Sequence, residues 1–239
     1  MEHMTIFAEI LSKYNELSES TLIDAIEIGA TRALKRALNA SIVVSYKEQL
    51  EITMLGAWGE SFEITPKQIG KRLQRSMLHE IEREIGIRQV LAESAKLKYL
   101  RGMVVPGVIR KIRGDNILVE MELEDQFARY ILLGVCPYRE QPVHERKVYR
   151  TGDIRKWYVT GVLPVQARER TMIVVRLSRR SRELPAILLR EKSGLERIFC
   201  IKRIPGALCH ITADRHIPKQ FINEVGKELQ ESIYVRIVK

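Results

Sequence analysis

Apolar residues recur every three or four positions through much of the first third of the chain, which is the spacing of helices that bury one face. The pattern predicts two successive helices, over residues 3–17 and 22–38, with Ser18 or Ser20 as the N-cap of the second. The period then changes to two. "SIVVSY" and "LEITML" predict a hairpin, and "GAWGESFEITP" predicts a turn and a short strand.

A third predicted helix is the longest and runs to Leu100. Thr65 is its predicted cap and Pro66 its first residue, because the fixed φ angle of proline suits that position. Its apolar face is formed by Ile69, Leu73, Met77, Leu78, Ile81 and Ile85. Residues 1–99 are therefore predicted to be a helical domain with a small β element.

From Arg101 onward the hydrophobic period is two. Five short strands are predicted in "MVVPGVIRKIR", "ILVEMEL", "QFARYILL", "YRTGDIRKWYVTGVLPV" and "ARERTMIVVRLS". The segments "GDN" and "TGD" supply turns between them. Five short strands within about eighty residues are typical of a small closed barrel. Trp157 and Tyr158 are adjacent and so point to opposite faces; Trp157 is predicted to face the core.

The last part of the chain mixes helices and strands in the order α-β-β-α-β. A short helix ends at Gly194, two strands flank a turn at Pro205 and Gly206, and Pro218 opens the second helix. The chain is therefore predicted to be an α+β multidomain protein, with domains at residues 1–99, 100–181 and 182–239.

Composition and charge narrow the functional classes. The net charge is +10, and residues 100–182 hold 17 Lys and Arg against 9 Asp and Glu, whereas residues 1–99 are nearly neutral. Clustered positive charge is typical of nucleic-acid binding, although a solvated basic surface would have the same composition. The arginines Arg176, Arg179, Arg180 and Arg182 directly follow or end the last barrel strand.

Several segments carry a resemblance to a known family. "GMVVPGVIRKIRGDNILVEM", "YRTGDIRKWYVTGV" and "MIVVRLSRR" resemble an S-one-type RNA-binding domain, which is an OB-fold barrel. "FEITPKQIGKRLQRSMLHEIEREI" resembles the linker helix of the NusA family of bacterial transcription elongation, termination and antitermination factors. "LSRRSRELPAILLREKSG" resembles the end of that family's barrel where it runs into the first KH helix. The chain is similar to a shortened member of that family, with a degenerate KH-like module that lacks the Gly-x-x-Gly loop and with no second KH domain.

The resemblance implies binding to RNA polymerase core through the first domain and to nascent single-stranded RNA through the barrel, with other elongation factors as further partners. If the first domain contacts polymerase, the exposed polar set on its second helix is the predicted contact: Glu27, Arg32, Lys35 and Arg36. Its apolar residues Leu22, Ile26 and Leu34 are predicted to pack into its own core.

The barrel's RNA site is predicted from two residue types, because single strands bind to basic grooves with aromatic rings on which bases stack. The predicted stacking rings are Phe127, Tyr130 and Tyr158. The predicted phosphate contacts are Arg110, Lys111, Arg113, Arg129, Arg155, Arg176, Arg179 and Arg180.

No enzyme motif is found in the sequence, so no catalytic residue and no cofactor are expected. The acids of residues 115–125 are interpreted as a solvated face. Cys200, Cys209, His210 and His216 match no common zinc spacing, and Cys200 is interpreted as a buried strand residue. Three scattered cysteines, no apolar segment of membrane-spanning length and an acidic N-terminus without a secretory pattern lead us to expect a cytoplasmic location of bacterial type.

Two further functions fit the same residues. A ribosome-associated translation or RNA-processing factor would use the barrel on structured RNA. An accessory subunit of a larger transcription assembly would keep the KH-like module as a structural piece. The partner of residues 1–99 separates the ribosome-associated factor from the polymerase-binding factor. Contact with RNA polymerase indicates the latter, and contact with ribosomal protein or rRNA indicates the former.

Overall fold

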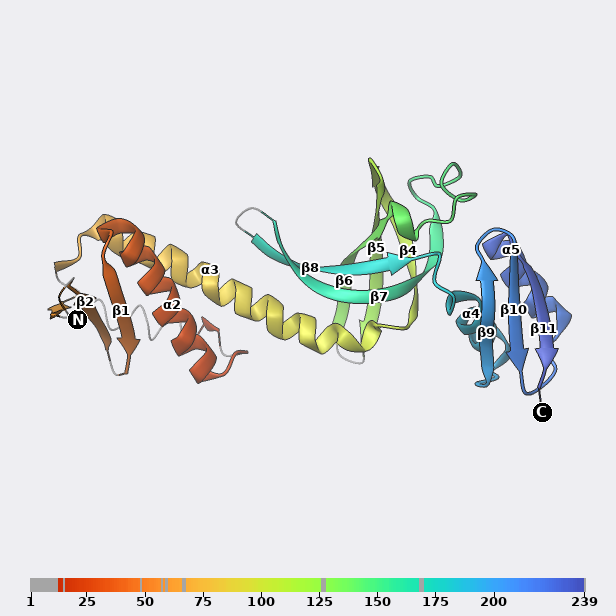
Figure 1. Cartoon of the computed structure of the whole chain (residues 1–239), viewed down its shortest axis with the longest axis horizontal. Helices are drawn as coiled ribbons and strands as arrows, with labels where there is room; N and C mark the ends of the chain where they lie inside the picture. Colours follow the sequence, from red (N-terminus) through yellow and green to blue (C-terminus); the bar gives the residue numbers. More distant parts are fainter. Residues whose placement is uncertain are drawn as a thin grey trace. The chain divides into compact units, whose positions relative to one another are not determined.

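The computed structural model describes residues 13–14, 16–47, 49–56, 58, 60–65, 68–125, 128–167 and 170–238, with the side chains at 124, 125, 128–130 and 170 excepted. In this part the fold is mixed α and β, with three sheets, one of them five-stranded (Figure 1). The elements are α2 (Glu19–Leu38), β1 (Ser41–Tyr46), β2 (Leu50–Leu55), β3 (Ser61–Ile64), α3 (Lys71–Lys96), η2 (Leu97–Leu100), β4 (Val104–Arg113), β5 (Asn116–Asp125), β6 (Ala128–Pro137), η3 (Tyr138–Glu140), β7 (Ile154–Ala167), β8 (Arg170–Ser178), α4 (Leu184–Ser193), β9 (Ile198–Ile204), β10 (Leu208–Ala213), α5 (Lys219–Leu229) and β11 (Ser232–Ile237).

The chain divides into two compact units. One contains the residues up to Lys96 together with Pro164–Met172, and the other contains Leu97–Leu163 with Ile173–Lys239. The second unit thus combines most of the barrel with the C-terminal α-β-β-α-β module, which we expected as separate domains. Val104 on β4 belongs to the apolar core of the C-terminal module, and α4 contacts β4, so the two share a packed boundary.

In the first unit, α2 packs against α3 and β1, and the antiparallel sheet has the order β1-β2-β3. Ser18 is the N-cap of α2, with its Oγ accepting a hydrogen bond from Thr21 N at 3.3 Å. Leu22, Ile26 and Leu34 are buried in the unit's core, as predicted. The hairpin formed by β1 and β2 is also observed.

The predicted start of the long helix is wrong by several residues. α3 begins at Lys71, because Thr65 and Gln68 close a local turn instead: Gln68 N donates to Thr65 O, and Thr65 N donates to Gln68 Oε1. Pro66 lies outside the described residues, as does most of the helix predicted over residues 3–17.

The five predicted strands of the middle segment form a closed barrel in the order β4-β5-β6-β8-β7 (Figure 1). Neighbouring strands are antiparallel from β4 to β6, whereas β6 and β8 are parallel. Trp157 fills the centre of the barrel core, fully buried, with its Nε1 donating to Gly107 O at 3.2 Å. Gly107 is needed at that point of β4, since a Cβ atom there would lie 2.5 Å from a methyl of Val119.

The C-terminal module has the predicted element order, α4-β9-β10-α5-β11. Its sheet order is β11-β10-β9, with β10 parallel to β11 and antiparallel to β9. The core lies between this sheet and helices α4 and α5, where Leu188, Leu189, Ile211, Val225 and Leu229 are buried. α4 ends at Gly194, whose φ of 69° and N–H bond to Arg190 O make it the C-cap, as predicted.

Candidate functional site

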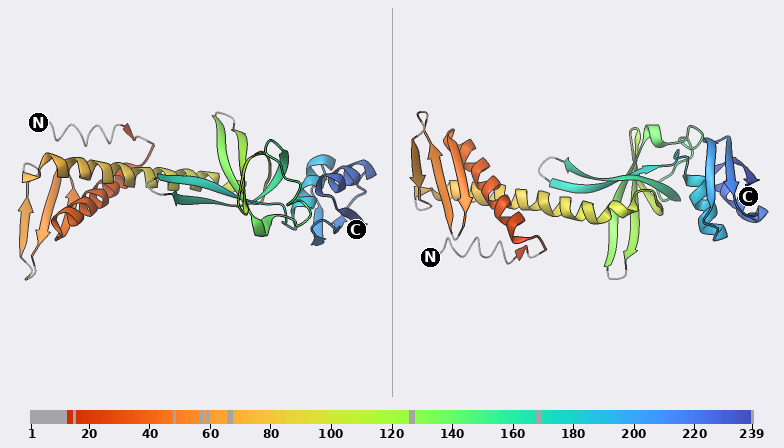
Figure 2. Two further views of the ribbon diagram at one scale, coloured as in Figure 1. Left: turned by 90° about the horizontal axis from the view of Figure 1, so that it is seen from above. Right: turned by 60° about the horizontal axis from the view of Figure 1, so that its bottom comes forward.

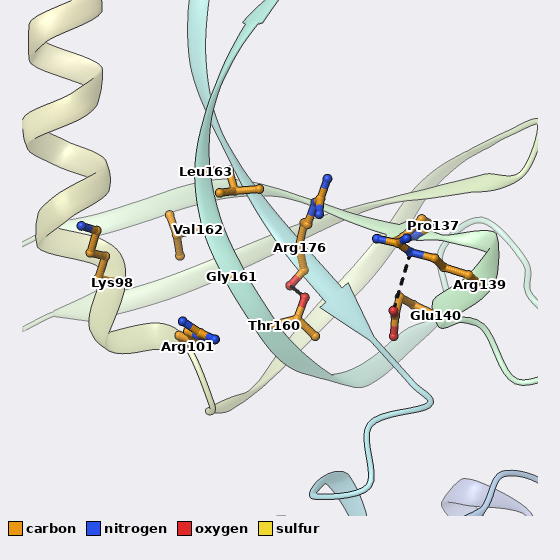
Figure 3. A pocket seen from close by; sticks show the side chains of 10 residues that line it. All are labelled: Lys98, Arg101, Pro137, Arg139, Glu140, Thr160, Gly161, Val162, Leu163 and Arg176. Carbon is orange, nitrogen blue, oxygen red and sulfur yellow. Dashed lines mark hydrogen bonds and ion pairs between the residues drawn. The ribbon is translucent and has the colours of Figure 1, made fainter.

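A basic hollow of about 690 Å³ opens on the barrel within the second unit (Figure 3). Its wall combines the segment that enters the barrel, the short η3 helix after β6, and the strands β7 and β8. We call this cavity the basic hollow. It is lined by Lys98, Arg101, Pro137, Arg139, Glu140, Thr160, Gly161, Val162, Leu163 and Arg176.

The charges in the basic hollow favour an anionic ligand. Lys98, Arg101, Arg139 and Arg176 supply four cations, all exposed, against the single carboxylate of Glu140. The ion pair between Arg139 and Glu140 is long, with 3.9 Å between Arg139 Nε and Glu140 Oε1, and the Arg139 side chain keeps 73% of its surface exposed. A pair this open is weak in water, so the Arg139 charge stays available to an incoming anion.

The hollow is also suited to a ligand with flat apolar parts. Val162 and Leu163 supply an apolar wall beside the cations. Two half-exposed tyrosine rings adjoin the lining residues in the chain, Tyr99 next to Lys98 and Tyr138 next to Arg139. The guanidinium of Arg146 lies 3.6 Å from the centre of the Tyr138 ring, a cation–π contact that covers one ring face.

The loop that follows β8 holds η3 in place. Arg179 N donates to Glu140 O at 3.0 Å, and the guanidinium Nη1 of Arg180 donates to Arg139 O at 2.8 Å. Two of the arginines that end the last barrel strand therefore fix the backbone from which Arg139 projects. Arg176, a predicted RNA contact, lines the hollow itself.

Arg179 was predicted to contact RNA, and the structure contradicts this. Its side chain is fully buried. The guanidinium makes two bonds to the Glu145 carboxylate, Nη2 to Oε1 at 2.6 Å and Nε to Oε2 at 3.1 Å. It also donates to Lys156 O at 2.7 Å and lies 3.5 Å from Glu228 Oε1 on α5. Arg179 therefore ties the barrel to the C-terminal module.

The Arg179–Glu145 pair is an ionised pair. Burial by itself disfavours the charge on Glu145, but the bonds and charge of Arg179 and the Tyr149 hydroxyl, 2.5 Å from Glu145 Oε2, outweigh it and lower the pKa of Glu145. Burial likewise opposes the charge on Arg179, and Glu145 nonetheless raises the pKa of that guanidinium. Burial and the Glu145 carboxylate together raise the pKa of Tyr149.

The predicted contacts on the first barrel hairpin do not line the basic hollow. Arg110, Lys111 and Arg113 are exposed at the end of β4. Arg110 is paired in a bidentate manner with Glu120 of β5, at 2.9 and 2.5 Å, and hydrogen bonding to that carboxylate raises its pKa. Lys111 and Arg113 remain predicted contacts on a separate part of the surface.

The predicted aromatic contacts do not share one environment in the structure. Tyr158 is half-buried and packs against the core of the C-terminal module, which weighs against it as a freely exposed stacking ring. Phe127 lies outside the described residues, and of Arg129 and Tyr130 the structure describes only the backbone, on β6. Trp157 is in the core, as predicted.

The Arg155 side chain is mostly buried and has partners within its own unit. Its side chain is 20% exposed, its Nη2 donates to Asp153 Oδ2 at 3.3 Å, and its guanidinium lies 5.1 Å from the centre of the Tyr149 ring. These contacts leave little of the side chain to reach an RNA phosphate, so the structure weighs against it as a contact.

The predicted polymerase-binding set lies on α2, and three of its members bind within their own unit. Glu27 accepts a hydrogen bond from Tyr46 N at 2.8 Å. Arg32 pairs with Glu84 at 3.0 Å and Arg36 with Glu80 at 2.8 Å, both on α3. Lys35 is exposed.

Sequence reasoning missed three cations of the hollow, Lys98, Arg101 and Arg139. Lys98 and Arg101 lie at the helix-to-strand junction, and Arg139 lies two residues after the end of the third strand. Basic residues at the ends of elements are the signal that could have found them, because strand ends meet where a barrel opens.

The remaining titratable clusters offer no metal site: among the described residues, no group of three or more His, Cys, Asp or Glu side chains could hold a metal ion. Cys200 and Cys209 are buried on neighbouring strands, with 3.2 Å between their sulfur atoms. Throughout the described ranges, no helix combines the length and the apolar character needed to cross a bilayer.

Comparison with known proteins adds little to this geometry. No protein-family model matches the chain, and no curated protein matches it. A crystal structure of "a multidomain protein with nucleic acid binding domains" from Streptococcus pneumoniae aligns at 12% identity with a TM-score of 0.23 over 69% of this chain. The alignment covers 53% of that protein, or about half its length. A TM-score this low establishes neither a shared fold nor a shared function.

Proposed function

We propose that this chain binds single-stranded RNA in the basic hollow and acts on transcription in the manner of the NusA family. The observation that carries the RNA part is the hollow itself: four exposed cations and an apolar wall gathered on a small closed barrel. Five-stranded barrels of the OB type bind single strands with such surfaces, and the barrel's strand order supports that type.

In this proposal the phosphates of the strand contact Lys98, Arg101, Arg139 and Arg176, and a base rests on Val162 and Leu163. The guanidinium groups suit phosphate because they present paired donors in one plane. The action is positional and electrostatic, and no residue performs chemistry. Held on emerging RNA, the protein modulates pausing, termination or antitermination.

The first unit is the proposed grip on RNA polymerase. Lys35 is exposed on α2, and so are Arg32 and Arg36, which also pair with carboxylates on α3. The C-terminal module is proposed to be a shortened KH-like domain, which its order α4-β9-β10-α5-β11 supports. Residues 182–239 contain no Gly-x-x-Gly, so RNA binding of the ordinary KH kind is not proposed.

RNA binding in the hollow should depend steeply on salt. Each phosphate neutralised on a single strand contributes about −0.7 to the slope of log affinity against log salt, so four cations give a slope of about −3. We expect the affinity for a fluorescein-labelled oligouridine to fall about 50-fold between roughly 50 and 200 mM NaCl, measured by fluorescence anisotropy. Unchanged binding over this range, or equal binding of a duplex, would count against the proposal.

The polymerase grip is tested separately with purified bacterial RNA polymerase core. We expect the full chain to co-migrate with the core enzyme in gel filtration, and Lys35→Glu to weaken the complex about fivefold or more, because reversing an interface charge turns attraction into repulsion. Lys71→Glu, an exposed charge reversal on α3, is the matched control. Binding to ribosomes with no binding to polymerase would favour a translation or RNA-processing factor instead.

A further inference from the structure

The sheet of the C-terminal module has one face without a covering element in the described structure. Helices α4 and α5 pack against the other face, on which Ile198, Cys200, Cys209, Ile211 and Ala213 are buried (Figures 1 and 2). The alternate residues of the three strands point away from the helices. We call this surface the open sheet face; it includes Phe199, Lys202, His210, Thr212, Tyr234 and Arg236, and β9 also exposes Ile201 and Ile204 beside them.

The strand register arranges these side chains in two rows across the sheet. Lys202, His210 and Tyr234 are aligned in one row, because Lys202 pairs with His210 and His210 with Tyr234. The other row is Phe199, Thr212 and Arg236. Each row therefore holds an aromatic residue at one edge of the sheet and a cation at the opposite edge.

The aromatic rings are presented to solvent. Phe199 is 56% exposed and Tyr234 is 57% exposed, so part of each ring is open to a ligand. The rings of His210 and Tyr234 are already stacked, with 5.4 Å between centroids and 25° between planes. The Arg190 guanidinium lies 5.4 Å from the centre of the Phe199 ring. These contacts restrain the rings, which lowers the entropy lost when a ligand binds.

The charge of the open sheet face has one sign. β9, β10 and β11 contain no Asp or Glu, and the face carries Lys202 and Arg236. Rows two residues apart on a strand are roughly 7 Å apart, and neighbouring strands are about 4.8 Å apart. Phe199 and Tyr234, on the two edge strands and in different rows, are therefore about 12 Å apart by this geometry.

We propose that the open sheet face is a second binding surface for single-stranded nucleic acid, with bases stacked on Phe199 and on the His210–Tyr234 pair and phosphates at Lys202 and Arg236. This goes beyond the hollow, and it rests on the proposed function for the nature of the ligand. Sheet faces with exposed rings bind single strands in this way elsewhere, since every base has a π-face. The uniform positive charge favours a polyanion over a protein segment.

The test uses the full chain with Phe199→Leu and Tyr234→Leu combined. Leucine keeps apolar surface but has no ring, so this variant separates base stacking from hydrophobic docking of a protein. We expect its affinity for the labelled oligouridine to fall about tenfold or more, because each stacked base contributes substantially to binding. Tyr234→Phe should bind as the wild type does. Phe62→Leu, which removes a ring 51% exposed on β3, is the matched control.

The outcomes separate this inference from the proposed function. A tenfold loss for the double Leu variant, with Phe62→Leu unaffected and with bromouridine crosslinks mapped to Phe199 or Tyr234, supports the open sheet face. Wild-type affinity in the double Leu variant, while alanines in the basic hollow abolish binding, overturns the open sheet face and leaves the hollow in place. A wild-type chain that binds no oligouridine at all overturns both.

Discussion

Replacing Lys98, Arg101, Arg139 and Arg176 with alanine is expected to lower the affinity for single-stranded oligouridine by about 10²- to 10³-fold at roughly 0.1 M salt, and to reduce the salt slope by about three. The four side chains are the cations of the basic hollow and project from its wall into solvent. None is part of a buried network, so the variant is expected to keep its fold. Anisotropy titrations at several salt concentrations measure both quantities.

The matched control removes four positive charges elsewhere. Lys35, Lys71, Arg72 and Arg75 are exposed on α2 and α3 of the first unit. Replacing them with alanine changes the net charge by the same amount and is expected to alter the affinity by less than about threefold, because none of them lines the hollow and salt screens exposed charges that do not contact the ligand. Similar losses in both variants would mean that binding follows total charge and that the hollow is not the site.

Arg179→Met is expected to destabilise the protein by about 3–5 kcal/mol at neutral pH. The substitution leaves the Glu145 carboxylate, itself buried, without the guanidinium that now makes two bonds to it. It also removes the donor to Lys156 O, and the charge that faces Glu228. Urea denaturation followed by circular dichroism measures the change. The nearby Arg182→Ala, at an arginine whose side chain is 64% exposed, should cost no more than about 0.5 kcal/mol.

The pH dependence of this pair has a definite sign. In the wild type the pKa of Glu145 is lowered, so its contribution to stability is fully present above the unfolded carboxyl pKa of about 4.3 and is lost as pH falls through the folded value. In Arg179→Met the buried carboxyl has lost its partner, and we expect its pKa to rise above the unfolded value. Its contribution is then present at low pH and lost as pH rises, so the variant's deficit should shrink between about pH 7 and pH 5.

A second variant tests whether Arg179 stabilises the protein through its charge or through packing alone. Arg179→Met combined with Glu145→Gln removes both charges, and we expect it to recover part of the lost stability, because the cost of the single change is mostly an unpaired buried charge. A loss that is the same in the single and double variants, and independent of pH, would mean that the guanidinium acts through packing alone.

Much of the local structure could be predicted from the residues. Periods of three to four and of two located the helices and strands of the described chain, since burial of one face dictates both. Local chemistry also determined two helix ends, because Ser18 caps α2 and Gly194 is the C-cap of α4. Adjacent residues of a strand face opposite ways, and of the neighbours Trp157 and Tyr158 it is Trp157 that lies in the barrel core, as predicted. The predicted helix start at Thr65 was wrong, because Thr65 N bonds to the side chain of Gln68, three residues later. This contact closes a turn before α3 begins at Lys71.

The functional roles of the arginines could not be predicted in the same way. Arg176, Arg179 and Arg180 are alike in sequence, yet one lines the hollow, one is buried and one fixes η3. What separates them is a carboxylate 34 residues away, Glu145, and another 49 residues away, Glu228. Local sequence carries no information on such a distant partner.

By itself, then, the sequence determined the elements, their order, a barrel-forming run of five strands and an excess of positive charge in the middle of the chain. Only the tertiary structure decided which charges remain free to meet a ligand. Closure of the barrel brings Lys98, Arg101, Arg139 and Arg176 together from three segments: the entry to the barrel, η3 and β8. Pairing of β9, β10 and β11 aligns Phe199, His210 and Tyr234 on one face. The physical reason is that hydrophobic periodicity is a local property, whereas burial and ion pairing depend on contacts between residues distant in the chain.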